Sequence, residues 1–174
     1  YGALADMSAA SVGSFTHVLR IDSQSYEVVG GTMILGYHPY FNKPASSGVS
    51  DLLELEDGRW VVVAGLSYGM LETPDAWTPT WWSQYQANPA TARPKGGPAL
   101  KVFDSAFKQL QFSSMVPGVR GVKLATRGRH VLLFGQVRRM DESYGLNLPP
   151  ILHRPLQAEF GGGATDAYLM LIDT

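Results

Sequence analysis

Short runs of apolar residues, each bounded by glycine, proline or aspartate, recur along the whole chain. Runs of this kind between turn-forming residues are typical of β-strands. No segment shows helical periodicity over three turns, and the one-turn candidate at 105–110 is better explained as a hairpin loop. The pattern therefore predicts an all-β protein whose strands include 15–22, 26–33, 110–116 and 166–173.

A hairpin motif occurs twice, with its two copies 70 positions apart. Residues 57–65 read Asp-Gly-Arg-Trp-Val-Val-Val-Ala-Gly, and residues 127–135 read Arg-Gly-Arg-His-Val-Leu-Leu-Phe-Gly. In each copy a glycine, Gly58 or Gly128, can supply the positive φ of a tight turn before an apolar strand. The motif predicts two equivalent hairpins.

A second motif, a short apolar strand that ends in aspartate, occurs three times. Its copies end at Asp22, Asp104 and Asp173, so the intervals between them are 82 and 69 positions. Aspartate favours a turn because its carboxylate accepts hydrogen bonds from the backbone that follows. We assign the longer first interval to an insertion at about 35–47.

Together the two motifs define a repeating unit of four antiparallel strands. The whole chain, 1–174, is then one repeat region with units at about 15–97 and 98–164 and a third unit that starts at 166. In each complete unit the strands, at 15–67 and 99–137, are followed by a long connection. Four-stranded antiparallel units repeated at this spacing are typical of β-propeller blades.

Residues 162–173, Gly-Gly-Ala-Thr-Asp-Ala-Tyr-Leu-Met-Leu-Ile-Asp, carry a resemblance to a known family. The chain resembles the seven-bladed β-propeller repeats of secreted bacterial proteins, and Leu148-Pro149-Pro150 resembles part of that family's connection between blades. The second copy departs from the pattern with Pro98-Ala99 in place of Asp-Ala. The resemblance implies an extracellular or periplasmic location and a scaffolding or binding role, and it supplies no catalytic residues to carry over. Because the sequence begins at Tyr1 with neither a methionine nor a signal-like segment, we expect a processed product from which a leader was removed.

Propellers close with about four to eight blades, whereas this chain supplies two units and one further strand. We therefore expect an incomplete propeller whose open edges are covered by further blades or by other protein subunits, because exposed sheet edges pair readily with other chains.

Charge and composition limit the classes of partner and site that the sequence predicts. The chain has 14 basic and 15 acidic residues, so nothing indicates binding to nucleic acid or to an anionic membrane. No apolar run approaches the roughly 20 residues of a transmembrane helix. The absence of cysteine excludes disulfides, thiolate metal sites and a cysteine nucleophile.

No constellation of residues predicts an enzyme, a metal site or a cofactor. The four histidines, His17, His38, His130 and His153, have no close metal-ligand spacing, and a G-x-S-x-G elbow is absent. The acidic residues Glu54, Glu56 and Asp57 are explained by a solvent-facing hairpin, and the glycines at 161–163 precede a strand where a phosphate loop would need a helix.

Aromatic side chains are the candidate binding residues. The candidates are Trp77, Trp81, Trp82 and Tyr85 in one connection, and Tyr37, Tyr40 and Phe41 in the insertion. Such rings can anchor a protein interface, stack on sugars, or fold over the edge of a blade. We predict a non-catalytic structural or interaction module that docks to partner subunits through blade edges and aromatic connections. The alternatives are a carbohydrate-binding propeller module and a fragment of a propeller enzyme.

Overall fold

The computed structural model describes residues 16–34, 36–38, 43–45, 47–66, 72–77, 97–116, 118–128, 130–138, 157, 159 and 161–173. Within these ranges the chain forms strands and turns and no helix, and all strand pairs are antiparallel. The predicted fold class, an all-β protein with antiparallel sheets, is confirmed.

The strands in chain order are β1 (Thr16–Ile21), β2 (Val28–Ile34), β3 (Gly36–His38), β4 (Lys43–Ala45), β5 (Ser47–Glu54), β6 (Trp60–Leu66), β7 (Pro98–Phe103), β8 (Leu110–Met115), β9 (Val119–Arg127), β10 (His130–Arg138) and β11 (Thr165–Asp173).

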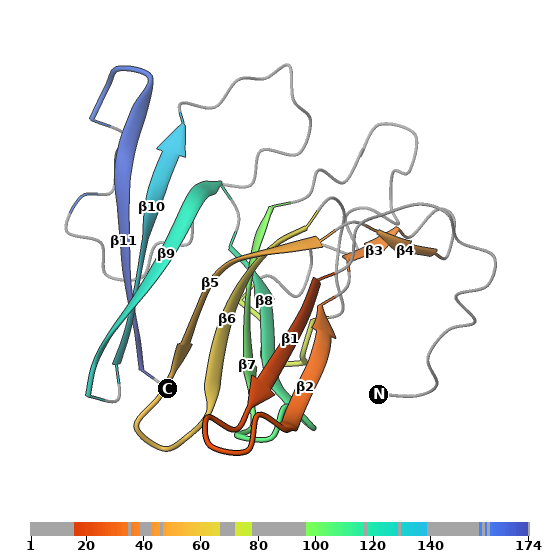
Figure 1. Cartoon of the computed structure of the whole chain (residues 1–174). Coiled ribbons are helices and arrows are strands. Elements are labelled where there is room, and N and C mark those ends of the chain that lie inside the picture. Colours follow the sequence, from red (N-terminus) through yellow and green to blue (C-terminus); the bar gives the residue numbers. More distant parts are fainter. Residues whose placement is uncertain are drawn as a thin grey trace.

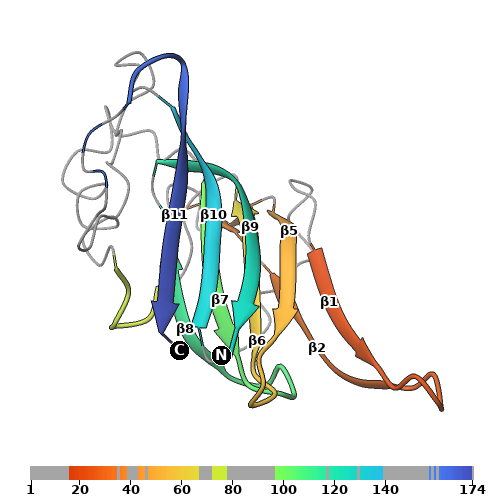
Figure 2. The ribbon, with the colours of Figure 1, turned by 90° about the vertical axis from the view of Figure 1, so that its left-hand side faces the viewer.

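Three of the sheets form a stack. The central sheet has the order β5-β6-β7-β8, and the C-terminal sheet, of β9, β10 and β11, packs on one of its faces (Figure 1). The β1–β2 hairpin packs on the opposite face, so the central sheet lies between the other two (Figure 2). The predicted insertion contains the small β3–β4 hairpin.

The strands group into sheets differently from the predicted four-stranded units. The strands at 15–67 and 99–137 do not form one sheet each, because the four-stranded sheet contains β5 to β8 and its boundary falls two strands later in the chain. β6 pairs with β7 along its whole length, from Trp60 opposite Phe103 to Gly65 opposite Pro98. The connection at 67–97 therefore joins two neighbouring strands of one sheet, not two separate blades.

The central sheet is buried on both of its faces. In β6 four consecutive apolar residues, from Val61 to Ala64, have no exposed surface. The first core, between the central and C-terminal sheets, contains Leu55, Val61, Val63, Leu100, Val102, Val116, Val119, Val122, Val131, Leu133 and Tyr168. The second core, under the β1–β2 hairpin, contains Val18, Ile34, Val62, Ala64, Ala99, Phe103, Phe107 and Met115. Adjacent residues of β6 thus alternate between two cores.

The turns form as the two motifs predict. Gly58 and Gly128 have φ of +84° and +58°, a region that glycine enters without steric cost. The Asp22 carboxylate accepts hydrogen bonds from backbone N–H groups two and three residues later, at 2.9 and 2.7 Å. The Asp104 carboxylate accepts them from groups four and five residues later, at 2.7 and 3.0 Å. The predicted strand at 26–33 was wrong at its start, because Tyr26 lies in the turn with φ of +60°.

The aspartate-ended strand faces the same way in all three sheets. Val18, Leu100 and Leu169 each lie four positions before the aspartate. Val18 contacts the central sheet in the second core, and Leu100 contacts the C-terminal sheet in the first core, so each points to the next sheet in chain order. Leu169 follows Tyr168, which points into the first core, and therefore points away from the stack. The three sheets are stacked in the same sense.

Close approach of the hairpin to the central sheet requires glycine at one position. A Cβ atom at Gly30 would lie 2.8 Å from the carbonyl oxygen of Ala106, whereas a Cβ at Gly48 has no atom within 4 Å. We therefore expect Gly30→Ala to lower the free energy of unfolding in urea by about 1–3 kcal/mol. The matched variant Gly48→Ala is expected to leave it unchanged or to raise it. Equal losses in the two variants would contradict the close contact.

Candidate functional site

Two exposed apolar surfaces lie at opposite ends of the stack. The N-terminal face consists of Leu19, Ile21 and Val28 on the β1–β2 hairpin, and the C-terminal face consists of Phe134, Leu169 and Leu171 on β10 and β11. These six side chains are between 41% and 66% exposed. Because exposed apolar patches on folded proteins often mark interaction sites, the two faces are the main candidate site.

The C-terminal face is continuous across β10 and β11. Phe134 lies directly opposite Leu169, and Leu132 lies directly opposite Leu171. Directly opposed residues share a face, with Cβ atoms roughly 4.5–5.5 Å apart. Lys123 and Ala125 of β9 lie opposite Phe134 and Leu132. The Lys123 ammonium reaches the central sheet, where it donates to the Ser50 carbonyl of β5 at 2.7 Å.

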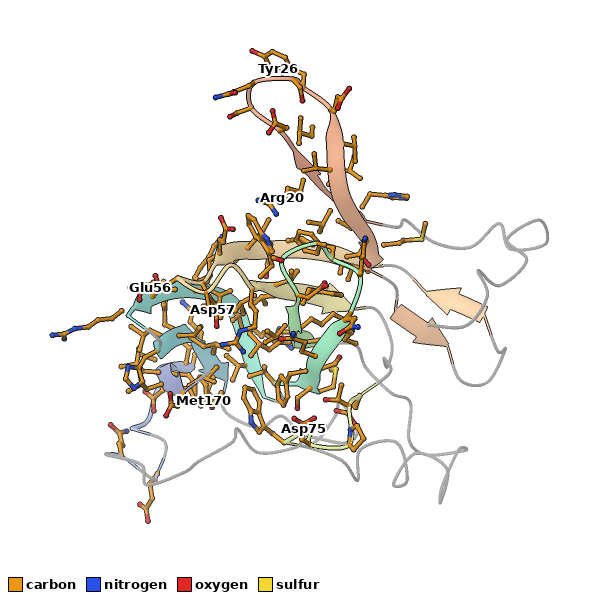
Figure 3. All side chains as sticks on the ribbon, turned by 90° about the horizontal axis from the view of Figure 1, so that it is seen from below. Arg20, Tyr26, Glu56, Asp57, Asp75 and Met170 are labelled. Atoms are coloured by element: carbon orange, nitrogen blue, oxygen red, sulfur yellow. The ribbon has the colours of Figure 1, made fainter. Side chains whose placement is uncertain are left out.

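The N-terminal face belongs to a hairpin that projects from the stack. In Figure 3 the hairpin extends beyond the central sheet, with Tyr26 at its tip. Its base is held by a hydrogen bond from Thr16 Oγ1 to the Ser47 carbonyl at 3.0 Å, and a second bond joins the Arg20 guanidinium to the Ser105 carbonyl at 3.0 Å. A two-stranded hairpin is marginal by itself in water, so this hairpin depends on contacts to its faces.

The β8 edge of the central sheet, in contrast, is covered by the segment 72–77. The backbone N–H of Thr73 donates to the Ser113 carbonyl at 3.1 Å, and the Ser113 N–H donates to Thr73 Oγ1 at 3.0 Å. The Met115 N–H donates to Glu72 Oε1 at 3.2 Å. These bonds satisfy backbone groups of β8 that would otherwise invite another strand.

Trp77 lies in this covering segment. Its ring is half-buried against the first core and lies 4.9 Å from the ring of Phe112, centroid to centroid. Its backbone N–H donates to Ser114 Oγ at 3.0 Å. The structure thus places Trp77 over the edge of the central sheet, apart from both apolar faces.

The other predicted aromatic residues are not brought together by the described part of the chain. Tyr37 lies in β3, where the backbone alone is described. Trp81, Trp82, Tyr85, Tyr40 and Phe41 lie outside the described residues.

A buried lysine is the chemically most unusual group. Lys101, in β7, is 4% exposed, and its Nζ donates to Ser113 Oγ at 3.0 Å. Burial lowers the pKa of Lys101 from 10.5 to about 8, although the nearby Glu72 carboxylate acts in the opposite direction. A serine beside a lysine of lowered pKa can form a nucleophile and base pair. Here Ser113 has no exposed surface, so the Lys101–Ser113 pair lies in the protein interior, away from solvent.

The lowered pKa of Lys101 predicts a dependence of stability on pH. The folded protein releases the proton near pH 8 and the unfolded chain near pH 10.5, so the unfolded state binds more protons between these values. Below pH 8 the folded protein bears the whole free-energy cost of burying the Lys101 ammonium, and this cost falls as the pH rises above 8. We expect the unfolding free energy to increase between pH 7.5 and 9.5, within a limit of about 3 kcal/mol.

The variant Lys101→Met should remove this rise, and it should be at least as stable as the wild type at pH 7. Urea denaturation followed by tryptophan fluorescence at several pH values measures the effect. Lys108→Met, at an exposed lysine, is the control and should retain the wild-type profile. A rise that persists in Lys101→Met would assign it to another group.

The residues considered for metal or acid–base chemistry lie apart. His17 is exposed on β1, and His130 is half-buried at the start of β10. In the β5–β6 turn Asp57 pairs with Arg59 at 2.6 Å, and this hydrogen-bonded pairing lowers the pKa of Asp57. Within the described ranges no cluster of three histidine, aspartate or glutamate side chains could hold a metal ion.

The chain is an all-β protein of antiparallel sheets stacked face to face. No protein-family model, no curated protein and no solved structure matches it. No helix among the described residues could cross a membrane.

Both apolar faces were missed by sequence reasoning, which concentrated on aromatic residues. The signal was present in β11, where Leu169 and Leu171 alternate with Tyr168, Met170 and Ile172. A strand that is apolar at every position is suited to burial on both faces.

Proposed function

We propose that the chain is a non-catalytic interaction module that docks to partner protein subunits through the two apolar ends of its sheet stack, in the extracytoplasmic setting that the repeat resemblance implies. The observation that carries the proposal is the exposure of the N-terminal and C-terminal faces. A large exposed apolar patch on a folded protein marks an interaction surface.

The stacking supports a propeller-like array as the form of this module. The central sheet is a four-stranded antiparallel meander with a neighbouring sheet on each face. The other two stacked sheets have one neighbour each among the described residues. In a propeller each sheet has a neighbour on both faces, so partner sheets at the two ends would complete the arrangement.

The proposed docking depends more on the two apolar faces than on the aromatic residues of the connections. Trp77 packs against the first core and is therefore a poor anchor for a partner. Trp81, Trp82 and Tyr85 stay a predicted contribution to docking. A sugar-binding role for these residues predicts a change of tryptophan fluorescence on titration with soluble glycans, and the interaction module predicts none.

Docking through the C-terminal face can be tested by co-purification with the tagged protein from its native source. Wild-type protein should retain a polypeptide in fixed stoichiometry, and Leu169→Lys/Leu171→Lys should lose it, because two charges would be desolvated in the interface. The matched control Gln109→Lys/Gln111→Lys adds the same charge on the exposed β8 hairpin and should retain the partner. Equal recovery with all three proteins, or no recovery at all, would contradict the proposed function.

A further inference from the structure

We propose that the partner of each apolar face is a second copy of this chain, joined head to tail, with the N-terminal face of one copy packed on the C-terminal face of the next. This inference rests on the proposed function and names its partner. It follows from which way the repeated strand faces in each sheet.

The N-terminal face occupies positions that elsewhere contact a preceding sheet. Ile21 lies one position before its aspartate, as do Phe103 and Ile172. Phe103 contacts the β1–β2 hairpin in the second core, and Ile172 packs against the first core beside the central sheet. In both internal interfaces this position therefore contacts the sheet that precedes it. Ile21 has the same orientation and is 54% exposed.

The C-terminal face occupies positions that elsewhere contact a following sheet. Leu169 and Leu171 lie four and two positions before Asp173, and Leu100 and Val102 have the same places before their aspartate. Leu100 and Val102 lie in the first core, against the C-terminal sheet. Leu169 and Leu171 are thus equivalent to buried interface residues, and they are 66% and 64% exposed.

The two faces are therefore the two unlike halves of an interface that the chain already forms twice. At each internal interface a face of the second kind packs on a face of the first kind. Placing the N-terminal face of one copy on the C-terminal face of another repeats that relation. Contact between unlike surfaces is heterologous, and it leads to a ring or to a filament according to the rotation between copies.

Complementation of two variants tests the proposal. The head variant, Leu19→Lys/Ile21→Lys, lacks a working N-terminal face, and the tail variant, Leu169→Lys/Leu171→Lys, lacks a working C-terminal face. Wild-type protein should exceed the 18.9 kDa of one chain in light scattering, with a mass that increases with concentration. Each variant alone should be a monomer. A mixture of the two should form a one-to-one complex of about 38 kDa, twice the mass of one chain, because one intact interface remains.

Circular dichroism and thermal melting of each variant show whether it is folded. If a lysine variant does not fold, the milder Leu19→Gln/Ile21→Gln or Leu169→Gln/Leu171→Gln replaces it in the same mixing experiment. Self-association of either variant alone at the wild-type level would overturn the head-to-tail arrangement, because contact between two like faces survives in one of the variants.

Two further outcomes separate this inference from the proposed function. A wild-type protein that stays a monomer at high concentration, while a different polypeptide co-purifies through the C-terminal face, would overturn self-association and leave the interaction module intact. A monomer that binds no polypeptide through either face would overturn both.

Discussion

The burial of β6 on both faces is the constraint on which the other contacts depend. Four consecutive apolar residues, from Val61 to Ala64, can leave water together only if other parts of the chain pack on both faces of the strand. The C-terminal sheet covers Val61 and Val63, and the β1–β2 hairpin covers Val62 and Ala64. The outward faces of the two outer sheets also carry apolar side chains, with Leu19 and Ile21 exposed on the hairpin and Leu169 and Leu171 exposed on β11. Stacking therefore covers both faces of the central sheet and leaves apolar side chains exposed on one face of each outer sheet.

Hydrogen bonds cover the β8 edge of the central sheet, whereas apolar packing covers its faces. The 72–77 segment bonds to the backbone of β8 and brings Glu72 close to the buried Lys101. An ammonium inside a sheet needs partners, and the Ser113 hydroxyl supplies one at 3.0 Å. The backbone at the β8 edge is therefore hydrogen-bonded within the chain, whereas the exposed apolar faces at the two ends are the surfaces that we propose for a partner.

Strands and turns could be predicted from the sequence because their causes are local. Gly58, Gly128, Asp22 and Asp104 act on their own turns, and the predictions at these four positions are confirmed. Sheet boundaries could not be predicted, because the pairing of β6 with β7 crosses a long connection that carries no pairing signal. The 70-residue alignment aligns Val61 with Val131, yet both point into the first core from opposite sides. The aspartate motif aligns Leu100 with Leu169, and these two residues face the same way in their sheets, so this motif and not the hairpin motif aligns equivalent positions.

The apolar faces could not be recognised from the sequence, because their residues occupy repeat positions that are buried elsewhere in the chain. An aliphatic residue such as Leu169 is indistinguishable from a core residue in sequence, and its position in the repeat is that of Leu100, which is buried. Its exposure becomes visible when the strands are placed in sheets and the sheets are counted. Leu169, at a repeat position that packs against a neighbouring sheet in the central sheet, then lies at the surface, whereas Trp77 packs against the first core. The surfaces that we propose for a partner therefore rest on repeat positions such as Leu169 and Leu171 and not on Trp77.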